Sequence, residues 1–66
     1  MDFSIIIPAF NEGNKIATDV LAAAEFIADH FKSGEIIVVD DGSTDDTAKN
    51  AETPTPANIS LHVISY

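Results

Sequence analysis

The chain has 66 residues, of which 45% are hydrophobic, and eleven acidic side chains against three lysines give it a formal net charge of −8. This acidity argues against nucleic acid or an anionic membrane surface as a partner, because binding to phosphates needs clustered positive charge. A chain this short buries only about 60% of the surface that its unfolded form exposes, and without cysteine it has no disulfides to compensate. We therefore expect a single small globular unit that forms part of something larger.

The first predicted element is a strand over residues 3–7, an almost continuous apolar run rich in β-branched residues. Such a run is typical of a strand buried on both faces, and Pro8 is expected to end it. No positively charged leader precedes the run, and no segment approaches the ~20 apolar residues of a membrane span. We expect a cytoplasmic location, with membrane association left to segments outside this chain.

The second element is an amphipathic helix over about residues 14–31, because apolar side chains recur there at helical spacing. Gly34 follows soon after, at a place where helices commonly end. The apolar residues with this spacing are Ile16, Val20, Leu21, Ala24, Ile27, Ala28 and Phe31.

The sequence pattern of residues 35–64 predicts a strand, a helix and a second strand. Residues 35–39 repeat the signal of a buried strand. A helix is expected from Ser43 to about residue 51, because Ser43 with Asp46 three residues later resembles a capping box. Residues 53–58 contain two prolines and form a linker. Residues 59–64 alternate between apolar and polar side chains, which predicts a half-exposed strand.

This order of elements, β-α-β-α-β, is typical of a parallel sheet with right-handed crossovers, which is a Rossmann-like α/β layer. If the strands are laid down in one direction, right-handed crossovers place both helices on the same face of the sheet. The other face of two strongly apolar strands then has no cover within this chain. We therefore expect residues 1–66 to be a truncated α/β domain.

The first segment that could carry chemistry is Pro8-Ala9-Phe10-Asn11-Glu12, which follows the first predicted strand. Open α/β sheets bind their ligands at this edge. Phe10 can offer a ring to a planar base, and Asn11 and Glu12 offer hydrogen-bonding groups. A purely structural interpretation also stands, in which Asn11 or Asn14 caps the helix and Phe10 joins the core.

The second segment begins with Asp40 and Asp41, which follow the second predicted strand. Adjacent carboxylates repel each other, so they are more often kept for a ligand, a metal or hydrogen-bond donors than for stability. A carboxylate can accept the imino proton of a pyrimidine or the donor edge of a guanine, and Gly42 permits close backbone approach. In the structural alternative, Asp40 accepts backbone amides in the turn. Asp45 and Asp46 are interpreted as first-turn acids that complement the helix dipole.

Other nucleotide-binding signatures are missing from the sequence. Neither strand is followed by Gly-x-Gly-x-x-Gly, and no Gly-x-x-x-x-Gly-Lys-Ser/Thr occurs. A phosphatase of the haloacid dehalogenase type would separate its two aspartates by one residue, whereas Asp40 and Asp41 are adjacent. One further hypothesis is an acidic interaction domain of the receiver type, which would be phosphorylated on Asp40 or Asp41.

Residues 5–12 read Ile-Ile-Ile-Pro-Ala-Phe-Asn-Glu, and residues 35–47 read Glu-Ile-Ile-Val-Val-Asp-Asp-Gly-Ser-Thr-Asp-Asp-Thr. In this order around a helix of this length, they resemble the opening motifs of family 2 glycosyltransferases, which include dolichyl-phosphate mannose synthases and bacterial polysaccharide enzymes. The resemblance implies the nucleotide-binding half of a three-layer GT-A fold and a UDP- or GDP-sugar donor. The family often has Tyr at the position of Phe10, so this chain keeps the ring but lacks the hydroxyl. The implied nucleotide-sugar-binding residues are Pro8, Ala9, Phe10, Glu12, Asp40 and Asp41, and of these Asp41 resembles the carboxylate that reads the base.

The same resemblance implies that the metal-binding Asp-x-Asp and the catalytic base lie beyond Tyr66. The complete enzyme would use a divalent metal, Mg²⁺ or Mn²⁺, whose ligands are not in this chain, and no residue here is assigned a catalytic role. The leading hypothesis is that the parent protein transfers a sugar from a nucleotide sugar to an acceptor, while this chain is inactive without the carboxy-terminal part of its domain. The alternative is a non-catalytic nucleotide-binding module.

Overall fold

The computed structural model describes residues 2–66, which form one three-stranded parallel sheet with two helices. Its elements are β1 (Ser4–Ala9), α1 (Ile16–His30), β2 (Gly34–Asp40), α2 (Thr47–Ala51) and β3 (Ile59–Ser65). The strand order is β1-β2-β3, so β2 lies in the centre and pairs with both neighbours. This confirms the predicted β-α-β-α-β parallel sheet.

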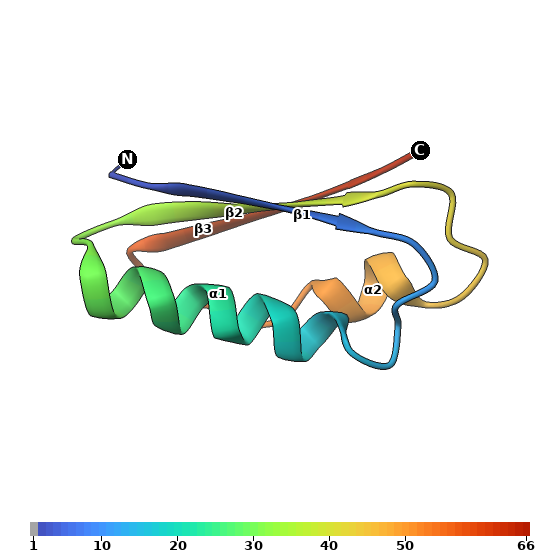
Figure 1. Ribbon diagram of the computed structural model, residues 1–66, viewed down its shortest axis with the longest axis horizontal. Coiled ribbons are helices and arrows are strands. Elements are labelled where there is room, and N and C mark those ends of the chain that lie inside the picture. Colours follow the sequence, from blue (N-terminus) through green and yellow to red (C-terminus); the bar gives the residue numbers. More distant parts are fainter. Residues whose placement is uncertain (1) are drawn as a thin grey trace.

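The core lies between the sheet and the two helices, which cover the same face (Figure 1). Because side chains alternate along a strand, every second residue of β2 points toward the helices, and Ile36 and Val38 are completely buried there. The apolar stripe of α1 packs against them through Ile16, Val20 and Ile27, which have no exposed surface. The helical spacing of the sequence therefore identified most of the buried face of α1, but Leu21 and Ala28 from that spacing are exposed and Ala23 is buried instead.

The opposite face of the sheet is open in the described chain (Figure 1). Ile6 in β1 is 64% exposed and Ile64 in β3 is 43% exposed, whereas Ile37 and Val39 in the central strand are half-buried. The uncovered face expected from the crossover rule is thus confirmed. Within this chain β1 and β2 are covered on one face only, although their apolar runs are typical of strands covered on both.

Strand β1 continues through Pro8 to Ala9, so the prediction that Pro8 ends it is wrong. Pro8 is in register with Val39, and Ala9 with Asp40. In this sheet β1 is an edge strand, and an edge tolerates proline because one side of the strand has no neighbour that needs its N–H group. Strand β1 therefore ends two residues later than predicted, at Ala9, directly before Phe10.

Helix α2 begins at Thr47, four residues later than predicted, and Ser43 does not form a capping box. Ser43 Oγ donates instead to Asp40 Oδ1, and the N-cap residue Asp46 makes no capping hydrogen bond with its side chain. Asp45 and Asp46 therefore precede the helix and are not first-turn acids. The residues taken for a first helical turn belong to the loop between β2 and α2.

Gly34 is the first residue of β2 rather than the end signal of α1, which stops at His30. A Cβ atom at Gly34 would lie 2.7 Å from Ile27 Cγ2 and 2.9 Å from the backbone oxygen of Phe3. We expect Gly34→Ala to lower the free energy of unfolding by about 1 to 3 kcal/mol, because α1 or β1 must move to make room. Urea denaturation checks this, with the exposed Lys32→Ala as control, and equal stability of the two variants would contradict it.

Candidate functional site

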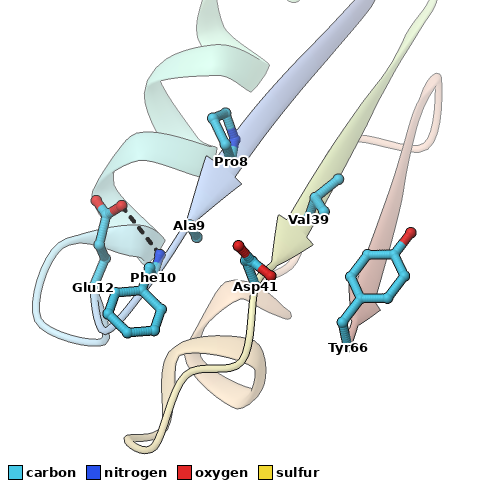
Figure 2. A pocket seen from close by; sticks show the side chains of 7 residues that line it. All are labelled: Pro8, Ala9, Phe10, Glu12, Val39, Asp41 and Tyr66. Atoms are coloured by element: carbon cyan, nitrogen blue, oxygen red, sulfur yellow. Dashed lines mark hydrogen bonds between the residues drawn. The ribbon is translucent and has the colours of Figure 1, made fainter.

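A pocket of about 340 Å³ opens at the carboxyl ends of the three strands. Its size is near the lower end of the roughly 300 to 1,000 Å³ of typical small-molecule sites. Figure 2 shows Asp41 between Phe10 and Glu12 on one side and Tyr66 on the other. The lining residues are Pro8, Ala9, Phe10, Glu12, Val39, Asp41 and Tyr66.

Five of the six residues predicted from the sequence line this pocket, and Asp40 does not. Asp40 is only 5% exposed, and its Oδ1 accepts hydrogen bonds from the backbone N–H of Ser43, at 3.2 Å, and from Ser43 Oγ. Asp41 is exposed and faces the pocket. The adjacent carboxylates thus point to different places, which separates their charges and leaves one of them accessible to a ligand.

Phe10 stands in the pocket wall with 58% of its surface exposed, so the alternative that places it in the core is wrong. The helix-cap alternative is also wrong, because the N-cap residue of α1 is Lys15 and it makes no capping hydrogen bond with its side chain. Asn11 instead adopts a left-handed conformation, with φ of 49°, which asparagine tolerates better than most residues. An accessible ring beside an accessible carboxylate is an arrangement suited to a planar, hydrogen-bonding base.

Glu12 is held from two sides at the rim of the pocket. Its Oε1 accepts a long hydrogen bond of 3.4 Å from the backbone N–H of Phe10, and its Oε2 lies 3.0 Å from Lys15 Nζ. Lys15 also donates to Asp19 at 2.8 Å, and this bond, followed by the one to Glu12, raises the pKa of the Lys15 ammonium. Glu12 therefore carries a permanent positive neighbour, although both side chains remain in contact with water.

The loop after β1 is attached to the loop after β2 by several hydrogen bonds. The backbone N–H of Asn11 donates to Ser43 Oγ at 2.8 Å, and Asn11 Oδ1 accepts from the backbone N–H of Thr44 at 2.8 Å. The backbone N–H of Gly13 donates to Asp45 Oδ2 at 3.1 Å. These contacts keep the two halves of the pocket wall in a fixed relation.

The pKa of Asp45 is lowered, mainly because the hydroxyl of Thr47 donates to its carboxylate and further because backbone N–H groups do so. A lowered pKa in the folded state stabilises the fold at pH values above the unfolded-state pKa of about 3.9, and this contribution is lost as the pH falls through the folded-state value. We expect Asp45→Asn to narrow the gap in melting temperature between pH 7 and pH 3, since asparagine does not titrate. Thermal unfolding across this range checks the sign, and parallel curves for the two proteins would contradict it.

Val39 and Tyr66 line the pocket but were missed from the sequence. Tyr66 is 80% exposed, and its backbone N–H donates to the carbonyl oxygen of Asp40 at 3.0 Å, which brings the end of β3 beside the end of β2. The rule that carboxyl ends of parallel strands share one edge would have pointed to Tyr66. Val39 has no such signal, because an apolar residue inside an apolar strand looks like core.

No group of three or more His, Cys, Asp or Glu side chains within residues 2–66 is arranged to hold a metal ion. The residues of the pocket therefore do not fit a divalent metal by themselves, and no chemical step within this chain is assigned to one. Across the same described residues, no helix has the length and apolar character needed to cross a membrane.

Comparison with known proteins gives two matches. The profile of the family described as "Glycosyl transferase family 2" matches residues 4–65. The chain is also similar to dolichyl-phosphate beta-glucosyltransferase of Saccharomyces cerevisiae, with 40% identity over 47 residues that cover 70% of this chain and 14% of that protein. The aligned part is thus a small share of the relative's length. No solved structure shows significant similarity.

Proposed function

Because the chain belongs to glycosyl transferase family 2, we propose that its protein transfers a sugar from a UDP- or GDP-sugar to an acceptor. In this proposal residues 1–66 supply the part of the donor site that binds the nucleoside. Pro8, Ala9, Phe10, Glu12 and Asp41 contact the nucleotide. Asp40 belongs to the same site and fixes the turn from which Asp41 projects.

The observation that carries the proposal is the exposed Asp41 carboxylate opposite the exposed Phe10 ring in one pocket. An ionised carboxylate only accepts hydrogen bonds, so its natural counterpart is the donor edge of a base, such as the imino group of uracil or guanine. The ring of Phe10 offers a flat apolar surface for the base itself. The two groups together favour a nucleobase over a purely anionic ligand such as free phosphate.

The diphosphate and the sugar require other groups. The pocket contains two carboxylates, Glu12 and Asp41, and no cationic side chain lines it. Lys15 pairs with Glu12, but within residues 2–66 Asp41 has no such partner, so a diphosphate placed here would meet repulsion unless positive charge came from elsewhere. We propose that Mg²⁺ or Mn²⁺ supplies that charge from ligands outside residues 1–66, together with the catalytic base. For this reason we expect the 66-residue chain alone to bind nucleotide weakly and to transfer no sugar.

The proposal is tested on the full-length protein that carries this chain. Isothermal titration with UDP, GDP and ADP measures whether a nucleotide binds and which base is preferred, and a radiolabelled donor measures transfer. Binding of UDP or GDP together with transfer supports the proposal. Absence of nucleotide binding at millimolar concentration overturns it, and binding without transfer favours the non-catalytic module instead.

The acceptor is best approached through the similar yeast protein, whose name states that it acts on dolichyl phosphate. We propose a polyprenyl phosphate of this kind as the first acceptor to offer in the transfer assay. A soluble sugar or a peptide in the same assay is the comparison. Label appearing in the organic phase with dolichyl phosphate, and not with the comparison acceptors, supports a lipid phosphate.

A further inference from the structure

Two short relays of hydrogen bonds join the segment from the end of β2 to the start of α2 with the loop after β1, and they have the same form. In the first, Asp40 Oδ1 accepts from Ser43 Oγ, and Ser43 Oγ accepts from the backbone N–H of Asn11 at 2.8 Å. In the second, Asp45 Oδ1 accepts from Thr47 Oγ1, and Thr47 Oγ1 accepts from the backbone N–H of Glu12 at 2.8 Å. The consecutive backbone amides of Asn11 and Glu12, in the loop after β1, are therefore held by the hydroxyls of Ser43 and Thr47.

The direction of each hydrogen bond in the second relay follows from its two ends. The amide of Glu12 can only donate, and an ionised carboxylate at Asp45 can only accept. The hydroxyl of Thr47 has one proton, so it must give that proton to Asp45 in order to present a lone pair to Glu12. An aspartate is ionised at neutral pH in any case, and the hydrogen bond from Thr47 lowers the pKa of Asp45 further, so the carboxylate stays ionised into more acidic solution. Without that carboxylate, nothing within the relay would orient the hydroxyl.

The middle of this relay is shielded from water, whereas Asp45 at its end is exposed and is held by its hydrogen bonds. Thr47 has no exposed surface. The other oxygen of the carboxylate, Asp45 Oδ2, accepts from the backbone N–H of Gly13 at 3.1 Å, and Asn50 Nδ2 donates to the Gly13 carbonyl oxygen at 3.1 Å. A Cβ atom at Gly13 would lie 3.1 Å from Asp45 Oδ2. Asp45 thus holds two successive residues of the first loop, Glu12 through Thr47 and Gly13 directly.

We propose that Asp45 is a positioning residue for the nucleotide pocket, which holds Phe10 and Glu12 at the correct separation from Asp41 without touching the ligand. This rests on the proposed nucleotide-binding function. Asp45 does not line the pocket, yet Glu12, which does, is bonded to the hydroxyl that Asp45 orients. The acidic residues of this loop therefore divide their roles, with Asp41 toward the ligand and Asp45 toward the neighbouring loop.

The chain offers a matched control at the next position. Asp46 is exposed and makes no capping hydrogen bond with its side chain, so Asp46→Ala removes the same charge from almost the same place as Asp45→Ala. In the full-length protein, we expect Asp45→Ala to raise the Kd for UDP or GDP about tenfold, the size of one typical hydrogen-bond loss. Asp46→Ala should change it by about twofold or less, as surface substitutions do. Asp45→Asn, which keeps an accepting oxygen, should restore most of the affinity.

A second variant and a second measurement separate the possible outcomes. Thr47→Val removes only the hydroxyl and should weaken binding as Asp45→Ala does, whereas Thr47→Ser should not. All affinities are measured by calorimetry well below each melting temperature, and hydrogen exchange at the Glu12 and Gly13 amides is followed without nucleotide. Faster exchange and weaker binding in Asp45→Ala, but not in Asp46→Ala, support the proposal.

Several results would overturn the positioning role. A lower melting temperature with unchanged Kd would make Asp45 a structural residue only. Equal exchange in both alanine variants would show that Asp45 does not hold the loop. If the wild-type protein binds no nucleotide while exchange still responds to Asp45→Ala, the proposed function fails and the loop contact stands, so the two failures are distinguishable.

Discussion

Replacing Asp41 with alanine in the full-length protein should weaken the binding of UDP or GDP by about 1 to 3 kcal/mol, the range for a lost hydrogen bond to a charged group. The structure makes Asp41 the exposed member of the Asp40–Asp41 pair and places it in the pocket with Phe10. Since the carboxylate of Asp41 is exposed and makes no buried contact, the melting temperature should hardly change. Titration calorimetry of the purified variant measures the effect.

Two companion variants define what Asp41 contributes. Asp29→Ala, at an exposed position on α1, removes the same charge away from the pocket and should leave the affinity unchanged. Asp41→Asn keeps an oxygen that accepts hydrogen bonds and should lie between wild type and Asp41→Ala. If Asp41→Ala binds both nucleotides as tightly as the wild-type protein, Asp41 is not part of the site.

The largest effect on stability is expected for Ile36→Ala, at about 2 to 5 kcal/mol of the free energy of unfolding. Ile36 lies in the central strand with no exposed surface, and it is in register with Ile5 of β1 and Leu61 of β3. Truncation there leaves a cavity beneath the helices, because both neighbouring strands and the helix layer hold the surrounding side chains in place. Urea denaturation followed by circular dichroism gives the difference directly.

Ile6→Ala is the matched control for Ile36→Ala, since it removes the same atoms from the uncovered face. Ile6 is 64% exposed in the chain, so we expect a cost of less than about 1 kcal/mol. Equal costs at the two positions would contradict the one-sided burial seen in the structure. They would mean that the uncovered face of the sheet is buried in solution.

Much of the fold could be predicted from the sequence because its signals are local. Apolar runs of β-branched residues marked the strands, and the spacing of residues such as Val20 and Ile27 marked the buried stripe of α1. The handedness rule for crossovers then placed both helices on one face and left the other open. The sheet edge that holds the candidate site followed from the same topology, because the carboxyl ends of parallel strands meet there.

The errors lie where contacts between distant residues outweigh local signals. Ser43 with Asp46 has the pattern of a helix cap, but the Ser43 hydroxyl donates to Asp40 and accepts from the backbone N–H of Asn11. Helix α2 starts only at Thr47. Asp45 has the pattern of a first-turn acid, but it accepts the amide of Gly13 from the other loop. The bonds from Asn11 to Ser43 and from Gly13 to Asp45 each join residues 32 positions apart, so no window of the sequence shows them. The bond from Ser43 to Asp40 spans only three positions, but it competes with the cap pattern.

The sequence by itself determined which segments become strands and helices, how they connect, and which sheet edge carries the candidate site, because hydrophobic periodicity and chain handedness are properties of the chain alone. The resemblance to a family singled out Asp41, but only the tertiary structure gave the physical reason why this acid faces the pocket. Asp40 and Asp41 are chemically identical neighbours, and Asp45 and Asp46 are too. Their surroundings distinguish them: Ser43 engages Asp40, Thr47 and Gly13 engage Asp45, and Asp41 remains open to a ligand.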